Sequence, residues 1–348
     1  MGKLGIAAFT EVGRQLGKDV AAKLKNSYEI CWYEQNLKEW CKTCFEQADA
    51  ILFIGACGIA VRSIAPLIQH KTKDPAVLVM DENANHVISL LSGHIGGANE
   101  LAVQIGTLTG ADPVITTASD VRGKIAVDVF AKKNDLIISD IKAAGKIAAA
   151  ILRGERVDLY CSGNVEGDCP PELHLISDRD EAEKSDASYL IWISEYLPFA
   201  GEASSETEKT ILHLIPRCVQ IGIGCRKGKP KEEIETVICR AAAQIGISLK
   251  SAAAAASIDL KKEEEGILGV CGEWEIPFTV FSAEELQKIE GSFTPSSFVA
   301  KTTGVDNVCE RSSLALCGSN GRLIGKKYAE NGVTAAFAEK EWRIRFEK

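Results

Sequence analysis

Short apolar runs alternate with segments of helical periodicity along the first third of the chain. The run at residues 50–55 is entirely apolar, which is typical of a strand in a parallel sheet that helices cover on both faces. Residues 11–25 carry apolar side chains at helical spacing, namely Val12, Leu16, Val20 and Leu24. The alternation predicts an α/β domain. The expected strands are 4–10, 28–33, 50–55, 76–80, 86–91 and 112–117, and the expected helices are 11–25, 37–48 and 100–108.

The pattern loosens after about residue 124 and becomes regular again at residues 219–223. We therefore expect an N-terminal α/β domain at 1–133, a smaller middle domain at 134–215 and a C-terminal α/β domain at 216–348, with mostly parallel sheets in the two outer domains. Further helices are expected at 126–132, 141–152, 231–245, 266–273, 283–289 and 308–317, and further strands at 157–161, 189–194, 219–223, 257–260, 277–281 and 333–338.

Composition and charge exclude several classes of protein. The 348 residues are 46% hydrophobic and 25% charged, and the net charge of −8 argues against a nucleic-acid-binding surface. No apolar run approaches the roughly 18 residues of a membrane span, and the first residues lack the features of a signal peptide. Cys41 and Cys44 form the one CxxC motif, without a second pair to complete a zinc site. We expect twelve reduced cysteines in a cytoplasmic protein without a metal site of its own.

The stretch with the clearest chemistry is Leu91-Ser92-Gly93-His94-Ile95-Gly96-Gly97-Ala98-Asn99-Glu100, between an expected strand and an expected helix. Backbone N–H groups at the start of a helix attract anions, and glycines let a ligand approach the backbone closely. His94 titrates near neutral pH. Thr116, Thr117, Ser119 and Asp120 follow the next strand and are expected nearby. The alternative is a packing turn with a hydrogen-bonded histidine.

A second loop, Gly55-Ala56-Cys57-Gly58-Ile59-Ala60-Val61-Arg62, follows the apolar strand at 50–55. Glycines at the carboxyl end of a central strand are a frequent ligand-binding feature of open α/β sheets. The Gly-x-x-Gly spacing differs from the dinucleotide fingerprint, which argues against a nicotinamide cofactor. We expect Gly55 and Leu91 to lie at the same edge of the sheet and to share a cleft, although a purely structural turn at 55–58 remains an alternative.

Two further stretches offer groups that bind anions. Residues 222–230 combine three glycines with Arg226, Lys227 and Lys229 before a helix, although the P-loop order is absent. Residues 301–310 form a polar loop that is expected to open the helix at 308–317. A solvated basic turn and a Glu310 that only favours the helix dipole are the structural alternatives.

These motifs, taken in order, resemble the cobalamin-biosynthesis CbiG family, the cobalt-precorrin-5A hydrolases. The resemblance is carried by residues 55–62, 91–102, 222–228 and 303–305 with Glu310, and Leu-Ser-Gly-His-Ile-Gly-Gly-Ala-Asn at 91–99 is its most specific part. It covers nearly the whole chain. The resemblance implies a hydrolase of vitamin B12 biosynthesis that opens the δ-lactone of cobalt-precorrin-5A, a cobalt-bound tetrapyrrole. The implied products are acetaldehyde and cobalt-precorrin-5B, from which the corrin ring contraction continues.

Lactone hydrolysis requires activation of water and stabilisation of an oxyanion. We expect His94 to be the base, the N–H groups of Gly96 and Gly97 to bind the oxyanion, and Asp81 and Glu310 to be further catalytic candidates. Cobalt belongs to the substrate, so no cofactor is expected; a homodimer and transient contacts with neighbouring pathway methyltransferases are left open. The residues expected to bind the polycarboxylate substrate are Gly55, Gly58, Arg62, Ser92, Gly93, Gly96, Gly97, Asn99, Gly222, Gly224, Arg226, Lys227, Lys301, Thr303, Gly304 and Val305.

Three other functions remain as alternatives. A corrinoid-binding or carrier protein without catalysis would use the same anion-binding loops. A nicotinamide-dependent oxidoreductase is suggested by the α/β pattern alone, against the glycine spacing. A thiol enzyme that uses Cys57 at a helix start is the third, although its apolar surroundings favour a packing role.

Overall fold

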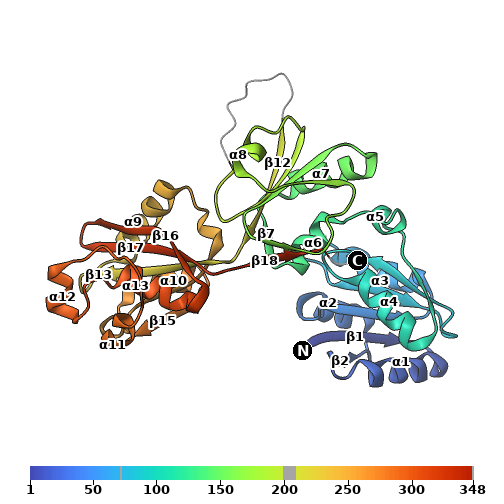
Figure 1. The fold of residues 1–348 in the computed structure, drawn as a ribbon. Helices are drawn as coiled ribbons and strands as arrows, with labels where there is room; N and C mark the ends of the chain where they lie inside the picture. Colours follow the sequence, from blue (N-terminus) through green and yellow to red (C-terminus); the bar gives the residue numbers. More distant parts are fainter. Residues whose placement is uncertain (71–72, 199–208, 347–348) are drawn as a thin grey trace. The chain divides into compact units, whose positions relative to one another are not determined.

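The computed structural model describes residues 1–70, 73–198 and 209–346 (Figure 1). It divides into two compact units, one of residues 1–129 and one that begins at Phe130. Each unit is α/β, as the alternation of patterns predicts, and parallel strand pairs predominate in the described sheets. Among the described residues, no helix is long and apolar enough to cross a membrane.

The first unit contains a six-stranded sheet in the order β2-β1-β3-β4-β5-β6. Its strands are β1 (Gly2–Ala8), β2 (Tyr28–Trp32), β3 (Ala50–Ile54), β4 (Ala76–Met80), β5 (His86–Leu91) and β6 (Asp112–Val114). Its helices are α1 (Glu11–Leu24), α2 (Leu37–Gln47), α3 (Cys57–Ile64), α4 (Ala98–Thr109), α5 (Ala118–Val121) and the start of α6 (Val127–Lys133).

Both faces of this sheet are buried, which explains the continuous apolar runs in its central strands. On one face Leu4 and Ile6 of β1 pack with Val20 of α1 and Ile105 of α4. On the other face the strands pack against α2 and α3, whose buried side chains include Trp40, Cys41, Cys44, Ala60 and Ile64. Cys41 and Cys44 are therefore core residues, and burial raises their pKa values to about 11 and about 12.

The direction of β5 determines where the loops of the first unit lie. β4 pairs with β3 in parallel, but β5 pairs with β4 antiparallel, so that Leu91 lies opposite Val77 at the start of β4. Gly55 lies at the other end of the sheet, where its N–H donates to the carbonyl of Met80 at 2.8 Å. The expectation that Gly55 and Leu91 share an edge and a cleft is therefore wrong, because β4 and β5 form a hairpin that reverses the chain.

The second unit contains two five-stranded sheets. The first has the order β10-β8-β11-β12-β7, parallel except for the edge pair β12–β7. The sequence pattern did not predict its strands β7, β10 and β12. Its elements are β7 (Leu136–Ile138), α7 (Ile141–Arg153), β8 (Val157–Cys161), β10 (Leu173–Ile176), α8 (Arg179–Glu183), β11 (Tyr189–Ile193) and β12 (Thr210–Pro216).

The second of these sheets has the order β15-β14-β13-β17-β16, with antiparallel pairing on the β17 side. Its strands are β13 (Val219–Cys225), β14 (Ala252–Ile258), β15 (Phe278–Phe281), β16 (Arg322–Glu330) and β17 (Val333–Glu339). Its helices are α9 (Lys231–Ile245), α10 (Glu265–Glu273), α11 (Ala283–Gln287), α12 (Ser297–Thr303) and α13 (Cys309–Cys317). A separate parallel pair joins β9 (Asn164–Glu166) to β18 (Arg343–Arg345).

Two expectations for this sheet were wrong. The strand expected at 257–260 is β14, which begins at Ala252, because the alanine run lies within the buried sheet beside β13, where small side chains fit. The strand expected to end at Ile223 continues to Cys225, because β17 pairs with β13 along that whole length. Both misplacements arise from tertiary pairing that outweighs local propensity.

Candidate functional site

The turn between β5 and α4 is tightly folded around its glycines. Gly97, the residue before α4, has a φ of 86°, in the left-handed region that favours glycine. A Cβ at Gly96 would lie 2.3 Å from Cβ of Ser92, and a Cβ at Gly93 would lie 2.6 Å from Oδ1 of Asn99. The glycines at 93 and 96 are thus required by close packing within the turn itself. The resulting backbone presents His94 toward the loop that follows β6.

His94 contacts a serine and two carboxylates from that second loop and from α6. Its Nε2 lies 2.8 Å from Oδ2 of Asp120 and 3.0 Å from Oγ of Ser119, and its Nδ1 lies 3.4 Å from Oδ1 of Asp128. Asn99 of α4 donates from Nδ2 to Oδ2 of Asp120 at 3.1 Å. We call these five residues the His94 cluster. The side chain of His94 is 19% exposed, so solvent reaches a largely enclosed imidazole.

The carboxylates set the protonation of His94. The hydrogen bond with Asp128 raises the pKa of His94, burial works against it, and Asp120 raises it further. Conversely, although burial alone would raise the pKa of Asp128, its contacts with His94 lower it. A proton on each ring nitrogen lets His94 donate to both carboxylates, which favours the imidazolium. The sequence did not show this upward shift of the His94 pKa, because it did not show two carboxylates beside the ring.

The oxyanion donors expected in this turn are not all available. The N–H of Gly97 donates to the carbonyl of His94 at 2.9 Å, which closes the turn before α4. Gly97 is therefore not a free donor. Two buried polar atoms of the same turn, Oγ of Ser92 and Oδ1 of Asn99, have no hydrogen-bond partner among the described residues. Unpaired buried polar atoms are uncommon, so the polar groups of this turn are not fully satisfied by the surrounding protein.

Sequence reasoning found part of the His94 cluster. Of the four residues expected near the glycine turn, Thr117, Ser119 and Asp120 contact it, since Nδ2 of Asn99 also donates to Oγ1 of Thr117 at 3.1 Å; these contacts do not include Thr116. Asp128 was missed. It is a single acidic residue in the first turn of a short helix, and such residues are usually explained by the helix dipole. Nothing in its local pattern distinguishes it from a solvated side chain.

The loop at 55–58 lies at the other end of the first sheet, beside the carboxyl ends of β1 and β4. In the order β2-β1-β3 the parallel strands β2 and β3 lie on opposite sides of β1, so the strand order reverses there, and open α/β sheets bind ligands at such a point. Arg62 is exposed, and its Nη1 donates to the carbonyl of Gly58 at 3.1 Å. Gly55, Gly58 and Arg62 therefore form a second candidate loop, separate from the His94 cluster.

Asp81 lies at this same end of the sheet and closes the β4–β5 hairpin. Its carboxylate accepts from the backbone N–H groups of Asn83 at 3.0 Å and His86 at 2.7 Å, and from Nδ2 of Asn85 at 3.1 Å. Burial alone would raise the pKa of Asp81, but these hydrogen bonds lower it. The arrangement is that of a turn-forming aspartate at the opposite end from His94, and it does not favour a role as a base beside that histidine.

The basic loop after β13 already contacts a carboxylate of the same chain, that of Glu264. The backbone N–H of Gly228 donates to Oε1 of Glu264 at 2.5 Å, and Nζ of Lys261 lies 2.7 Å from Oε2 of the same carboxylate. Gly222 and Gly224 lie within β13 rather than in the loop, contrary to expectation. Gly222 is required by packing, since a Cβ there would lie 1.7 Å from the carbonyl oxygen of Cys309. The exposed side chains of Arg226 and Lys227 remain as binding candidates.

The stretch at 301–310 also differs from expectation. Residues 297–303 form α12, so Thr303 and Gly304 end a helix instead of opening one, and Gly304 has the φ of 79° common at such ends. Val305 is 1% exposed and packs with Leu286. Lys301, in the last turn of α12, is exposed. The helix end follows from the hydrogen bond between the N–H of Gly304 and the carbonyl of Ala300.

Glu310 is fully buried at the start of α13. Its Oε2 accepts from the N–H of Thr294 at 2.7 Å and from Nδ2 of Asn307 at 2.9 Å, and its Oε1 accepts from Oγ1 of Thr294 at 2.8 Å and from the N–H of Lys327 at 2.6 Å. Glu310 thus joins three segments of the unit. This geometry favours a structural role over the catalytic one that the sequence suggested.

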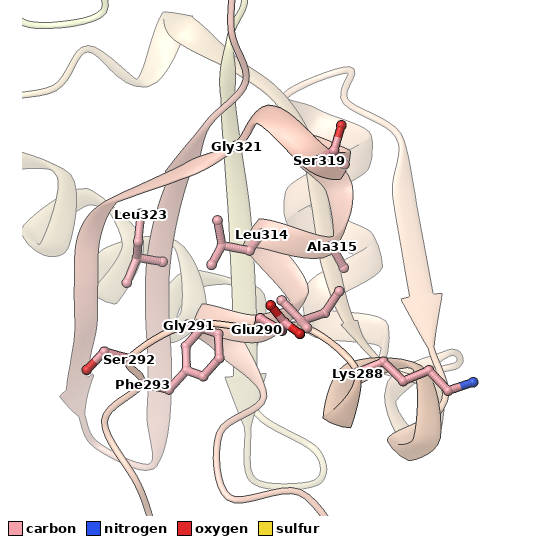
Figure 2. Close-up of a pocket in the computed structure, with 12 residues that line it drawn as sticks. Lys288, Glu290, Gly291, Ser292, Phe293, Leu314, Ala315, Ser319, Gly321 and Leu323 are labelled. Atoms are coloured by element: carbon pink, nitrogen blue, oxygen red, sulfur yellow. The ribbon is translucent and has the colours of Figure 1, made fainter.

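A pocket of about 540 Å³ lies between α13, the segment after α11 and the start of β16. Figure 2 shows Leu314, Leu323 and Phe293 around its centre, whereas the Lys288 ammonium points away from it. Arg311 lies over the ring of Phe293, with 4.3 Å between the guanidinium carbon and the ring centroid. None of the residues expected from the sequence lines this pocket, since its apolar lining comes from scattered positions of helix, turn and strand.

Comparisons with known proteins show to which family the chain belongs. Residues 39–120 match the family model described as Cobalamin synthesis G N-terminal, residues 125–216 the Cobalamin biosynthesis central region, and residues 219–338 the Cobalamin synthesis G C-terminus. The chain is 34% identical to the cobalt-precorrin-5A hydrolase of Salmonella typhimurium, over 95% of this chain and 96% of that protein. The chain belongs to the cobalt-precorrin-5A hydrolase family.

A second member of the cobalt-precorrin-5A hydrolase family, from Priestia megaterium, is 33% identical over 84% of this chain and 79% of its own length. A crystal structure of a cobalamin biosynthesis protein G homologue from Sulfolobus solfataricus is 27% identical, covers 97% of each chain and has a TM-score of 0.42. The resemblance expected from the sequence motifs is confirmed. Within the family's own division, His94, Ser119 and Asp120 lie in the N-terminal match, Asp128 in the central match and the pocket in the C-terminal match.

Proposed function

We propose that the protein is a cobalt-precorrin-5A hydrolase, which opens the δ-lactone of its tetrapyrrole substrate with water and releases acetaldehyde to give cobalt-precorrin-5B. The observation that carries the catalytic part of the proposal is the His94 cluster, in which one imidazole contacts two carboxylates and a serine. Membership of the hydrolase family supports the reaction class. The cobalt ion enters and leaves with the substrate.

The cluster has the parts that lactone hydrolysis requires. Water adds to the lactone carbonyl and must lose a proton as its oxygen forms the new bond. The neutral form of His94 accepts that proton at Nε2, and Asp128 at Nδ1 holds the ring in place and stabilises the imidazolium that forms. Asp120 is 41% exposed on its side chain, so an incoming substrate can replace its contact with Nε2. The carbon–oxygen bond of the lactone then breaks, which gives a carboxylate and an alkoxide on the two-carbon fragment. As the alkoxide becomes a carbonyl, the carbon–carbon bond between this fragment and the macrocycle breaks, acetaldehyde leaves, and the electron pair of that bond stays on the tetrapyrrole.

The charge of the substrate suggests where the rest of it binds. A tetrapyrrole with several carboxylates would be repelled by a chain of net charge −8 unless cations are gathered locally. Arg62, Arg226, Lys227 and Lys301 are exposed and offer such charges, each within its own unit. We propose these as binding residues together with the loop at 55–58. Each contact should weaken with added salt, since exposed charges are screened within roughly 10 Å.

The decisive experiment incubates the full chain with cobalt-precorrin-5A and measures acetaldehyde. His86→Ala is a matched control for His94→Ala, because His86 is an exposed histidine at the first residue of β5, the strand that leads into the turn of His94. Acetaldehyde release by the wild type and by His86→Ala, with loss in His94→Ala, would support the proposal.

If substrate binds and no acetaldehyde appears, the protein is the corrinoid-binding or carrier protein of the alternative reading. Location in the cytoplasm, a homodimer and contacts with pathway methyltransferases are further proposals, which fractionation, light scattering and co-purification would test.

A further inference from the structure

Three buried side chains that play no part in the proposed reaction meet at one point of the second unit. Glu195 follows β11, Cys218 precedes β13, and Glu339 ends β17 opposite Val219. They are 0%, 2% and 6% exposed, and one ligand atom from each lies within 4.8 Å of the others. We call these three residues the junction cluster. Two carboxylates and a thiol at this spacing are an unusual content for a protein interior.

Oε1 of Glu195 is the atom that the surrounding protein leaves unsatisfied. Ser162 donates from Oγ to Oε2 of Glu195 at 2.8 Å, but Oε1 has no hydrogen-bond partner among the described residues. The nearest cationic atom, Nη2 of Arg322, lies 4.0 Å away and is held by Glu339 at 2.6 Å. A fully buried carboxylate oxygen without a partner costs free energy, and it indicates a missing cation or proton.

We propose that the junction cluster binds a divalent metal ion of the zinc type. Two carboxylate oxygens and a thiolate supply three ligands, which leaves a fourth position for water. Charge supports this choice: a dication together with the Arg322 guanidinium balances the two carboxylates and the thiolate. A thiolate ligand selects a zinc-like ion over magnesium or calcium, which prefer oxygen ligands alone.

The surroundings of the cluster fit a metal site in two further ways. Nε1 of Trp342 donates to Oε1 of Glu339 at 3.1 Å, so both carboxylates are oriented by neighbours as metal ligands commonly are. Burial, and then the charge of Glu339, raise the pKa of Glu195, and burial raises the pKa of the Cys218 thiol. A bound metal ion would instead lower the pKa of the Cys218 thiol, because a thiol that coordinates a metal ion is deprotonated.

Such an ion would have a structural role. The junction cluster links the end of β11, the two-residue connection between β12 and β13, and the end of β17. These segments belong to the two five-stranded sheets of the second unit. Binding energy at the cluster would hold the sheets together, since a ligand that binds the folded form alone stabilises it. This inference is independent of the proposed hydrolase activity.

The test uses the full chain without a purification tag, stripped with a chelator and then titrated with Co²⁺ as a spectroscopic probe. We expect one Co²⁺ per chain, a thiolate-to-cobalt charge-transfer absorption, and displacement by Zn²⁺. Glu195→Gln keeps the shape of the side chain but removes its charge. It should weaken Co²⁺ binding at least about tenfold, as substitutions at metal sites of other proteins typically do. Cys218→Ser should abolish the charge-transfer absorption.

Cys271→Ser is the matched control, because Cys271 is a buried thiol of α10 in the same unit. It should keep both the affinity and the absorption. Binding that survives unchanged in Glu195→Gln and Cys218→Ser would overturn the proposal, since the ion would then lie elsewhere. So would a wild type that binds no ion and instead shows the infrared carbonyl band of a protonated carboxyl group that disappears in Glu195→Gln. Circular dichroism of each variant establishes that it is folded.

Discussion

Replacing His94 by alanine removes the group that we place next to the reacting water. Loss of a general base costs roughly 100- to 10,000-fold in the chemical step, which corresponds to about 3–5 kcal/mol of transition-state stabilisation. The structure adds a second consequence, because Asp120 and Asp128 lose the imidazole that separates them. Hydrogen bonds to charged groups contribute about 1.5–3 kcal/mol, so His94→Ala should also lower the stability of the first unit.

The two effects can be separated by a second variant and by saturating substrate. His94→Gln keeps a side-chain N–H that can donate to one carboxylate, and it should recover part of the stability without recovering turnover. The assay is single-turnover release of acetaldehyde from cobalt-precorrin-5A, with chemical unfolding measured on the same preparations. A His94→Ala chain that is folded and retains near-wild-type turnover at saturating substrate would refute the role of His94 as base. A rise in KM alone would make it a binding residue.

Three other predictions follow from the contacts of the described residues. Asp128→Asn removes the largest cause of the raised pKa of His94. The acidic limb of the pH–rate profile reports deprotonation of His94, so it should lie at lower pH in this variant than in the wild type. An unchanged limb would show that another group titrates. Ser119→Ala should reduce turnover by less than about tenfold if His94 activates water directly, whereas a loss as large as that of His94→Ala would make Ser119 the nucleophile. Glu310→Gln should destabilise the second unit by about 2–3 kcal/mol in urea unfolding, because a charged acceptor of several buried hydrogen bonds is lost, while Glu263→Gln, at an exposed position, should have little effect.

The acid–base linkage of His94 also has a defined sign. A histidine whose folded-state pKa is raised binds its proton more tightly in the folded chain than in the unfolded one. Its contribution to stability is complete below the unfolded pKa of about 6.5 and is lost as pH rises through the folded value. The difference in unfolding free energy between wild type and His94→Gln should therefore shrink as the pH is raised through that range. A difference that grows with pH would contradict the raised pKa.

The spacing of apolar residues predicted a strand or helix correctly where the element's own sequence carries the pattern. The buried strand at 50–55 and the amphipathic helix at 11–25 are found close to where the pattern places them, because helices cover both faces of the strand and one face of the helix is buried. The edge strands β7 and β10 and the alanine strand β14 were missed or displaced. Their short or small-residue sequences acquire strand structure from pairing with β12, β8 and β13, which no local pattern records.

The site residues likewise fall into those that the local sequence reveals and those that only the fold brings together. His94 and the glycines beside it are recognisable because a strand-to-helix turn constrains its own sequence, and Asn99 lies one residue into the helix that follows. Asp128 becomes informative only when the fold brings it to Nδ1 of His94. The anion-binding tendency of the loop at 225–230 was inferred for sound reasons, but Glu264, from a distant position, provides the anion. Spacing along the chain cannot distinguish a ligand from a side chain of the same protein.

The place of the His94 cluster follows from a general rule once the direction of β5 is known. Ligands in open α/β sheets bind beyond the carboxyl ends of parallel strands. β5 and β6 are parallel to each other, with His86 opposite Asp112, but β5 is antiparallel to β4. The carboxyl ends of β5 and β6 therefore meet at one end of the sheet, and the loops that follow them bring His94 to Ser119 and Asp120. The loop at 55–58 obeys the same rule for β1, β3 and β4 at the other end. One reversed hairpin thus gives a single sheet two candidate sites, so that a substitution at His94 leaves the loop of Arg62 at the other end of the sheet untouched.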